Sequence, residues 1–288
     1  MENEYAIALG TFDGLHKGHI SVLRKALGFK DLKKAVITFS LPPKSIIGNT
    51  EPELLMTAKE KSEILTKMGF DELIFLDFNL IRDLSPLEFL SLIFEEFPIK
   101  EIAVGYNYRF GKNGSGDTKI LSEFCRENGA VLNVLPEEKV DGEAVSSTVI
   151  RELVKNGEIK KANRMLSHNF YFKSEVIDGD HRGRELGFPT VNQIIPESLV
   201  MPQFGVYASY VSIGGRSYPA VTNIGKRPTF NKSDVIAETN VFDFSGDCYG
   251  KTLSVELIDF IRPEKKFNSK EELIKRMETD KAIALKVL

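Results

Sequence analysis

Two of the four histidines in this 288-residue chain lie three residues apart, at His16 and His19. They follow an apolar run over residues 5–9 that predicts a buried strand, and they precede apolar residues at helical spacing. Both imidazoles therefore fall at the start of a predicted helix, where unpaired N–H groups and the helix dipole favour an anion. Glycines leave a phosphate room to approach, and the expected contacts are Gly10, Phe12, Gly14, His16, Gly18 and His19. The alternative is a glycine-rich turn with two solvated histidines.

A second anion site is expected where residues 145–151 read Val-Ser-Ser-Thr-Val-Ile-Arg. Hydroxyl groups at this position can cap the helix that follows, which is the simplest interpretation. Together with backbone N–H groups and an arginine one turn into the helix, they can also clasp phosphates. The expected contacts are Ser146, Ser147, Thr148 and Arg151.

Aromatic and amide side chains at residues 106–110 suit a ring-shaped ligand. An arginine beside aromatic rings can hold an isoalloxazine or adenine ring by stacking, and Asn107 can both donate to and accept from a base edge. The candidates are Asn107, Arg109 and Phe110. An ordinary exposed loop with buried Tyr and Phe side chains explains the same pattern.

Residues 179–192 combine three glycines with two arginines and end in Thr190 and Asn192. Glycines such as Gly183 and Gly187 let a loop close over phosphates. A threonine hydroxyl and an asparagine carbonyl are hard oxygen ligands, so Thr190 and Asn192 are candidates for holding a Mg²⁺ that bridges phosphates. No Gly-Lys-Ser/Thr follows, which excludes a Walker A loop. By composition alone the stretch reads as a surface loop.

The elements that must position these residues alternate between strand-like and helical patterns up to about residue 135. After the run at residues 5–9, strands are expected at residues 35–39, 73–77, 102–105 and 131–135. Thr57 with Glu60, and Ser85 with Glu88, predict capping boxes at the starts of two intervening helices. This βαβα rhythm predicts a parallel sheet, and the candidate loops that follow its strands would gather at its carboxyl edge.

Beyond residue 170 the apolar residues change from a helical to an alternating period. Strands are expected at residues 170–177, 205–213, 217–224, 236–244 and 252–261, with a two-residue hairpin turn at Gly214-Gly215. Runs of strands without helices between them predict a small antiparallel barrel. A final helix is expected from Ser269, with Glu272 closing a capping box.

The composition of the chain limits its expected binding partners and its expected cellular compartment. Thirty-eight basic against 41 acidic residues give a net charge of −3, which offers no overall field for nucleic acid, so any phosphate site is local. Two cysteines far apart in sequence, without metal-ligand spacing, fit a reducing cytoplasm. With no targeting pattern and no apolar run of about 18 residues, a soluble protein without a membrane partner is expected. The oligomeric state is left open.

The motifs, taken in order, resemble those of one enzyme family. In its full form, from Gly10 to His19, the first motif resembles the G-x-F-D-G-x-H-x-G-H signature of bacterial bifunctional riboflavin kinase/FMN adenylyltransferases, also called FAD synthetases. Residues 145–151 resemble the ISSTxxR motif of the nucleotidyltransferase superfamily, and residues 183–192 resemble the riboflavin kinase signature GRxLGFPTAN. Similarity continues through residues 223–230, 238–250 and 262–267, so the resemblance spans nearly the whole chain.

The resemblance implies a Rossmann-like nucleotidyltransferase domain over residues 1–156, a helical connector over residues 157–168 and a barrel-shaped riboflavin kinase domain over residues 169–288. It implies ATP-dependent phosphorylation of riboflavin to FMN, followed by adenylylation of FMN by ATP to give FAD and pyrophosphate. His16 and His19 would stabilise charge developing on the phosphates. Thr190 and Asn192 would hold Mg²⁺, and Asn107, Arg109 and Phe110 would contact the flavin.

Glu238 falls at the position of the family's catalytic glutamate, which implies a base for the 5′-hydroxyl of riboflavin. The expected strand places Glu238 on one face with Ile236, Phe242 and Phe244, and an apolar surround would make it a stronger base. The alternative is an edge-strand glutamate that faces water.

Two other functions remain open from the sequence. One is adenylyl transfer to a different phosphate acceptor, such as phosphopantetheine or a polyol phosphate, which the GRELGFPTVN stretch disfavours. The other is a non-catalytic regulator that binds a flavin or a nucleotide. The presence of His16, His19, Thr190, Asn192 and Glu238 together disfavours the regulator.

Overall fold

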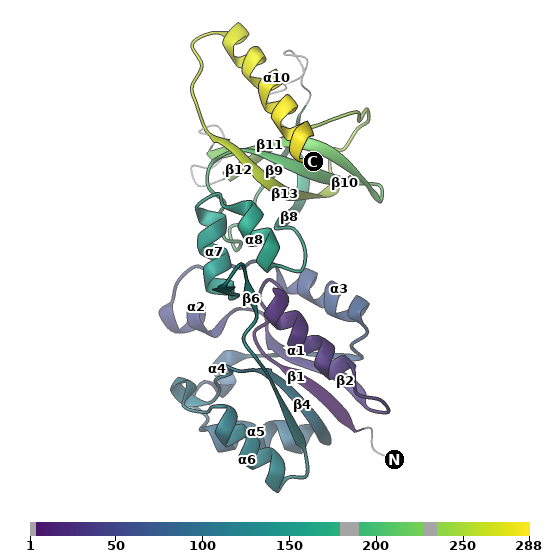
Figure 1. Cartoon of the computed structure of the whole chain (residues 1–288), viewed down its shortest axis with the longest axis vertical. Coiled ribbons are helices and arrows are strands. Elements are labelled where there is room, and N and C mark those ends of the chain that lie inside the picture. Colours follow the sequence, from purple (N-terminus) through teal and green to yellow (C-terminus); the bar gives the residue numbers. More distant parts are fainter. Residues whose placement is uncertain (1–3, 179–189, 227–234) are drawn as a thin grey trace. The chain divides into compact units, whose positions relative to one another are not determined.

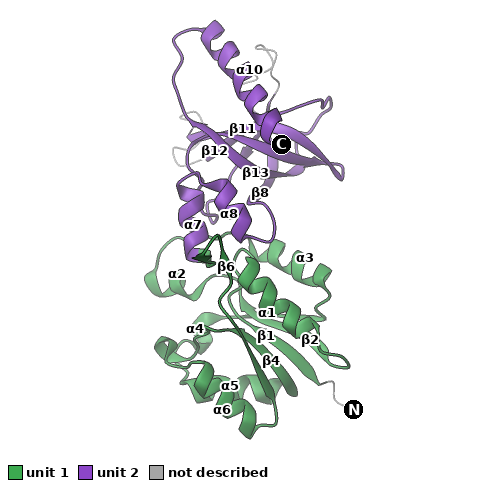
Figure 2. Cartoon of the chain, viewed as in Figure 1, with its two compact units in different colours: residues 1–147 green, residues 148–288 purple. Residues whose placement is uncertain are grey.

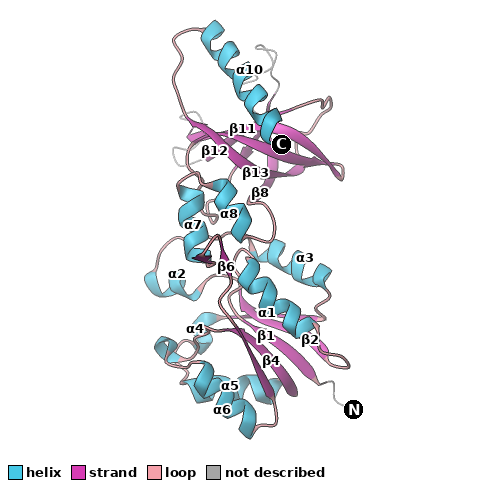
Figure 3. Ribbon diagram, in the orientation of Figure 1, coloured by secondary structure: helices cyan, strands magenta, loops and turns pink. Residues whose placement is uncertain are grey.

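The computed structural model describes residues 4–178, 190–226 and 235–288, and the chain divides into two compact units (Figure 1, Figure 2). Unit 1 covers residues 1–147 and unit 2 covers residues 148–288. Helices flank a parallel sheet in unit 1, and a closed antiparallel barrel followed by a terminal helix forms most of unit 2 (Figure 3). The fold class predicted from the sequence is confirmed.

The sheet of unit 1 has five parallel strands in the order β3-β2-β1-β4-β5. They are β1 (Tyr5–Leu9), β2 (Lys33–Phe39), β3 (Glu72–Leu76), β4 (Ile99–Gly105) and β5 (Val131–Leu135). The chain crosses from one side of β1 to the other between β3 and β4, so the strand order reverses beside β1. In open parallel sheets, ligands bind beyond the carboxyl ends of the strands at such a point. The sheet therefore places the loop after β1, which carries the two histidines, where a ligand is expected.

Helices cover both faces of this sheet. They are α1 (Lys17–Leu27), α2 (Pro43–Gly48), α3 (Ala58–Met68), α4 (Phe78–Ile81), α5 (Pro86–Glu96) and α6 (Thr118–Glu127). Buried side chains of α1 and α3 form one core cluster with Ala8, whereas those of α5 and α6 form another with Ile7. Successive residues of a strand point to opposite faces, so β1 contributes to both cores.

Both capping boxes predicted in unit 1 are confirmed. The Thr57 hydroxyl accepts from the Glu60 N–H (3.3 Å), and the Glu60 carboxylate accepts from the Thr57 N–H (2.8 Å). Ser85 and Glu88 make the same reciprocal pair at the start of α5. These pairs satisfy N–H groups that the first helical turn leaves without partners.

A two-stranded ribbon and two helices lead into the barrel. The ribbon pairs β6 (Lys139–Val140) with β7 (Glu143–Ala144), and the helices are α7 (Ser147–Lys155) and α8 (Ile159–Met165). Gly157, with a φ of 72°, lies between the two helices. The boundary between the units falls after the first residue of α7.

Six strands close the barrel in the order β10-β11-β12-β9-β8-β13, and β13 pairs with β10. They are β8 (Tyr171–Ile177), β9 (Thr190–Ile194), β10 (Gly205–Ile213), β11 (Arg216–Lys226), β12 (Val235–Val241) and β13 (Thr252–Pro263). Gly214 and Gly215 join β10 to β11 with φ angles of 57° and 79°. Two consecutive left-handed residues match the twist of a hairpin, so the predicted two-residue turn is confirmed.

Strand β9 was not expected, because its residues fall in a stretch that reads as a loop. Its alternation is hidden because the buried positions Asn192 and Gln193 are polar. The Gln193 carboxamide nitrogen donates to the carbonyl oxygens of Ser174 (2.7 Å) and Leu253 (3.0 Å). A buried amide can replace an apolar side chain when its hydrogens are bonded in this way.

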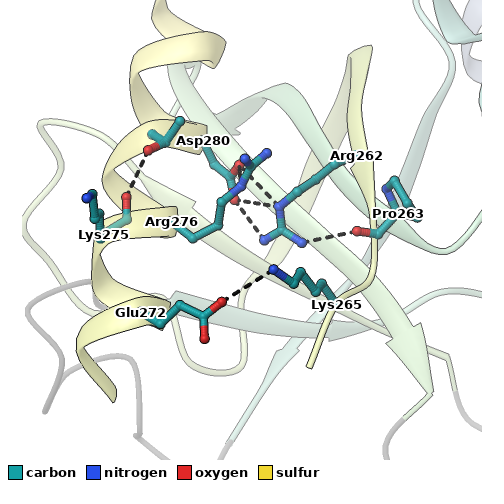
Figure 4. Close-up of polar contacts among 8 residues, drawn as sticks. Arg262, Pro263, Lys265, Glu272, Lys275, Arg276 and Asp280 are labelled. Carbon is teal, nitrogen blue, oxygen red and sulfur yellow. Dashed lines mark hydrogen bonds and ion pairs between the residues drawn. The ribbon is translucent and has the colours of Figure 1, made fainter. Parts of the chain in front are cut away.

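The terminal helix α10 (Lys270–Val287) is joined to the barrel by one buried carboxylate (Figure 4). Asp280 is 2% exposed and accepts from Nε (3.0 Å) and Nη2 (2.8 Å) of Arg262, near the end of β13. Nε of Arg276 lies 2.9 Å from the Asp280 carboxylate. Two guanidinium groups thus surround one carboxylate, which offsets the cost of burying it.

The start of α10 differs in one detail from the prediction. Ser269 caps the helix by accepting from the Glu272 N–H (3.1 Å). The Glu272 carboxylate accepts from the Asn268 N–H (3.2 Å) and therefore does not close a box with Ser269. This backbone bond is the main cause that lowers the pKa of Glu272. Within residues 4–178, 190–226 and 235–288, no helix is both long and apolar enough to cross a membrane.

Candidate functional site

The histidine loop, defined as residues 10–19, leaves β1 with an unusual backbone. Phe12 and Leu15 have positive φ angles of 48° and 41°, and Gly14 has a φ of 79°. Left-handed conformations cost roughly 1–2 kcal/mol for residues other than glycine. Both Phe12 and Leu15 are buried, so packing holds this loop in a conformation that its residues do not favour.

The two histidines lie against each other at the start of α1. Nδ1 of His16 accepts from the His19 N–H (3.2 Å) and so caps the helix. The two rings are stacked, with centroids 3.5 Å apart and an interplanar angle of 17°. Because Nδ1 of His16 accepts, its neutral ring carries the hydrogen on Nε2. The structure thus brings together the two histidines that the sequence singles out.

Three glycines of the histidine loop allow neighbouring side chains to pack closely against its backbone. A Cβ atom on Gly10 would lie 2.9 Å from the Phe12 ring, and one on Gly18 would lie 3.3 Å from the His16 ring. A Cβ atom on Gly14 would lie 2.6 Å from a methyl group of Leu55. The glycines therefore serve the shape of the loop as well as the open approach predicted for a phosphate.

Asp13 connects the histidine loop to two distant segments. Its carboxylate accepts from the Leu55 N–H (3.0 Å), and its backbone carbonyl accepts from the Ser147 hydroxyl (2.9 Å). Ser147 therefore holds the loop through its hydroxyl hydrogen. Thr148 and Arg151 follow on α7 within unit 2.

Lys61 is a buried cation near the same loop that the sequence analysis missed. It lies on α3 and is 3% exposed. Its ammonium donates to the Thr11 carbonyl (2.9 Å) and the Phe39 carbonyl (2.7 Å). The available signal was its position, because Lys61 shares the inward helical face with Leu65, four residues later.

The loop that follows β4 in unit 1 contains the residues predicted to bind an isoalloxazine or adenine ring. Asn107 and Arg109 are exposed, and Arg109 lies 3.9 Å from Asp117. Phe110 is 6% exposed and packs in the core near Phe89. The structure thus gives Phe110 the position of a core residue, and only Asn107 and Arg109 are open to a ligand.

In unit 2, candidate residues share one face of three neighbouring strands. Asn192 on β9 pairs with Glu238 on β12, and Glu238 pairs with Asn223 on β11. Thr190 pairs with Asn240, two positions along the same strands. Side chains directly opposite on antiparallel strands lie on the same face with Cβ atoms about 4.5–5.5 Å apart. The structure therefore gathers Thr190, Asn192 and Glu238, which are up to 48 positions apart in sequence.

The surroundings of Glu238 differ from the sequence prediction. Strand β12 ends at Val241, so Phe242 and Phe244 lie beyond it and do not continue the face of Glu238. The backbone turns at Asp243, whose φ is 53°. Glu238 is half-buried between two asparagines on the neighbouring strands, and of its three expected apolar neighbours Ile236, two positions earlier on β12, shares its face.

The residues beside Glu238 fit a hard cation. Asn192 is 6% exposed, and its Oδ1 has no hydrogen-bond partner among the residues that the structure describes. A buried carbonyl oxygen without a partner costs free energy unless a ligand satisfies it. This oxygen and the Thr190 hydroxyl are donors of the type that Mg²⁺ prefers. Gly183 and Gly187, the glycines predicted to cover phosphates, lie outside the described residues.

Two family models match this chain, one in its N-terminal part and one in its C-terminal part, in the order that the sequence motifs predict. A family model described as FAD synthetase matches residues 1–149, and one described as riboflavin kinase matches residues 166–288. Together the two matches cover nearly the whole chain.

Three curated relatives match along most of their length and share the name bifunctional riboflavin kinase/FMN adenylyltransferase. The relative from Bacillus subtilis is 34% identical, over 97% of this chain and 91% of its own. That from Listeria monocytogenes is 32% identical, over 95% and 89%. That from Escherichia coli is 31% identical, over 96% and 91%.

A solved structure from Streptococcus pneumoniae, named as a macrolide-efflux protein, has nearly the same fold. It superposes with a TM-score of 0.89 at 30% sequence identity. The match covers 99% of this chain and 94% of that chain. The parallel sheet and the closed barrel described above are thus both found in an experimental structure.

Proposed function

The chain belongs to the family of bifunctional riboflavin kinase/FMN adenylyltransferases, and on this premise we propose how its residues divide the two reactions. The enzyme phosphorylates riboflavin with ATP to give FMN, and it adenylylates FMN with a second ATP to give FAD and pyrophosphate. We assign FMN formation to a domain over residues 169–288 and FAD formation to a domain over residues 1–156. Residues 157–168 form the connector.

For FMN formation, Glu238 acts as the base. It accepts the proton of the riboflavin 5′-hydroxyl as that oxygen bonds to the γ-phosphorus of ATP and the bond to ADP breaks. Thr190 and Asn192 hold Mg²⁺, which would neutralise charge on the phosphates when bound. Gly183 and Gly187, which lie outside the described residues, are the further phosphate contacts that the sequence predicts. The observation that carries this assignment is the buried Asn192 Oδ1, which has no hydrogen-bond partner in the described part of the chain and lies in the strand position opposite Glu238.

For FAD formation, no strong base is needed because the attacking FMN phosphate is already an anion. Its oxygen bonds to the α-phosphorus of ATP, and the bond to pyrophosphate breaks. His16 and His19 stabilise the charge that develops on these phosphates. The expected phosphate contacts also include Gly10, Phe12, Gly14, Gly18, Ser146, Ser147, Thr148 and Arg151, and Asn107 and Arg109 contact the flavin.

The placement of His16 and His19 supports this assignment. They lie at a helix N-terminus beyond the carboxyl end of β1, where the strand order reverses. Helix N-termini favour phosphates through their N–H groups and dipole. Ser147 contributes mainly by fixing the loop, since its hydroxyl hydrogen is donated to Asp13. We further propose a cytoplasmic protein that binds neither nucleic acid nor membranes, consistent with the free thiols of Cys125 and Cys248.

Two variants, assayed by chromatography of flavin products with ATP and Mg²⁺, test this division of labour. We expect His19→Ala to convert riboflavin to FMN but to lose FAD formation by about 10²–10³-fold. We expect Glu238→Gln to form FAD from supplied FMN but to lose riboflavin phosphorylation by about 10²–10⁴-fold. The reaction that each variant retains is its own control for folding. Loss of both reactions in either variant, when folded, would contradict the assignment.

A further inference from the structure

The ammonium group of Lys61 is fully hydrogen-bonded although it is buried. Besides the carbonyl oxygens of Thr11 and Phe39, it donates to the hydroxyl of Thr38 (3.2 Å). A lysine ammonium has three N–H donors, so each one has an acceptor in this arrangement. These acceptors are neutral, and the cation therefore serves to hold backbone oxygens rather than to pair with a carboxylate.

The three acceptors belong to two segments at the carboxyl edge of the sheet. Thr11 begins the histidine loop, whereas Thr38 and Phe39 end β2. The Thr38 hydroxyl also donates to the Thr11 carbonyl (2.9 Å). Lys61 thus ties the start of the histidine loop to the end of the neighbouring strand and to α3.

The histidine loop needs such a tie because its backbone is strained. The positive φ angles of Phe12 and Leu15 persist only where surrounding contacts fix the chain. Asp13 fixes the middle of the loop, and the His16 cap fixes its end. Lys61 fixes the start of the loop. Its positive charge also offsets the partial negative charge of carbonyl oxygens that would otherwise repel a polyphosphate.

We propose that Lys61 is a positioning residue for FAD formation, whose ammonium holds the histidine loop in the conformation that accepts the phosphates of ATP. This inference rests on the assignment of FAD formation to residues 1–156. Stability alone does not account for a lysine here, because burying a charge costs free energy that an apolar side chain of similar length avoids.

The charge of this residue is sensitive to pH. Burial lowers the pKa of Lys61 from 10.5 to about 8, and the negative charge of Asp13 partly opposes this shift. Among the described contacts, the other groups facing the ammonium are uncharged, including the Phe75 ring on β3 at 5.5 Å. Glu60, beside it on α3, directs its carboxylate to Thr57. Above about pH 8, the neutral amine has two hydrogens for three acceptors, so its hold on the loop weakens.

Activity and stability should therefore change in opposite directions as the pH rises. The unfolded chain keeps the Lys61 pKa near 10.5, so between about pH 8 and 10.5 it binds more protons than the folded chain. The Lys61 contribution to the free energy of unfolding consequently increases with pH over this interval. FAD formation decreases over the same interval, which a merely structural role would not produce.

The test compares Lys61→Met, Lys61→Arg and a control, Lys59→Met, in the full chain. Lys59 lies on the same helix but is exposed, so its replacement changes charge without touching the loop. FAD formation from supplied FMN and FMN formation from riboflavin are measured from pH 7 to 9.5. We expect Lys61→Met to lower kcat for FAD formation about 10²-fold without changing FMN formation. Lys61→Arg should retain activity without the decline above pH 8, because guanidinium stays protonated.

Three results would overturn the inference. These are normal FAD formation by Lys61→Met, an equal effect of Lys59→Met, and an alkaline decline of Lys61→Arg that matches the unchanged enzyme. If Lys61→Arg does not fold, the test uses the enzyme without substitutions. Equal pH profiles for its FAD formation and its FMN formation would also contradict the inference. If His19→Ala still forms FAD, the proposed function itself fails. If His19→Ala is inactive while Lys61→Met is active, only the role of Lys61 fails.

Discussion

Gly14 combines two constraints that no other residue type meets. Its φ of 79° is left-handed, and an added Cβ would lie 2.6 Å and 2.8 Å from atoms of the Leu55 side chain. Gly14→Ala should therefore distort the histidine loop and destabilise the chain by about 1–3 kcal/mol. We expect FAD formation to fall at least tenfold while FMN formation is unchanged, as measured by product chromatography.

Gly69 provides the matched control for this substitution. It also lies in unit 1 with a left-handed φ of 101°, but an added Cβ would meet no atom within 4 Å. Gly69→Ala should show the backbone cost, about 1 kcal/mol, without an effect on FAD formation. Equal activities of the two variants would show that the contact with Leu55 does not shape the site.

For single residues, the sequence identifies candidate site residues better than it predicts the contacts that those residues make. His16 and His19 are recognisable because two rare residues recur at helical spacing beside glycines. The bond from Ser147 to Asp13 joins residues 134 positions apart, and no local pattern announces it. Lys61 shares a helix face with Leu65, but its bonds to the Thr11 and Phe39 carbonyls follow only from the position of α3 against the sheet.

Among the elements, α10 contacts the barrel through a buried ion pair as well as through an apolar cluster around Ala284. Asp280 is buried where it meets Arg262 and Arg276, whose side chains are 15% and 34% exposed (Figure 4). Asp280→Asn should lower the free energy of unfolding by about 3–5 kcal/mol, because it leaves buried guanidinium charge without its carboxylate. Urea denaturation followed by circular dichroism measures this loss.

Lys265 supplies a matched exposed pair beside this cluster. Its Nζ lies 3.3 Å from Glu272, and the two side chains are 64% and 40% exposed. Lys265→Met should change the free energy of unfolding by about 0–1 kcal/mol, since water and salt screen such pairs. A loss as large as that of Asp280→Asn would argue against the special role of the buried pair.

Strong periodicity made most elements predictable, and its absence explains the exceptions. The strands of the sheet follow from uninterrupted apolar runs, and the helix starts follow from Ser, Thr and Glu at capping spacing. Strand β9 was missed because Asn192 and Gln193 occupy buried positions. Asn192 forms part of the candidate kinase site and Gln193 bonds within the barrel, so polar residues with specific contacts interrupt the apolar alternation that normally reveals a strand.

For the whole molecule, each of the two units has its own core, and our assignment places FAD formation within residues 1–156 and FMN formation within residues 169–288. We therefore expect a mixture of His19→Ala and Glu238→Gln to convert riboflavin to FAD, since FMN released by the first variant can bind to the second. The measurement is FAD yield against time, compared with each variant alone. No FAD from the mixture, when Glu238→Gln alone accepts added FMN, would indicate that FMN is not released.

The two cysteines give this division a practical consequence. Cys125 lies on α6 in unit 1, and Cys248 lies in unit 2; both are free and buried. Burial raises the pKa of the Cys125 thiol to about 11 and also raises that of Cys248. A thiol reagent can therefore react at either site mainly when the surrounding structure opens. The rate at which a thiol reagent labels Cys125 therefore reports the opening of unit 1, and the rate at Cys248 reports that of unit 2. Mass spectrometry can measure the two labelling rates separately.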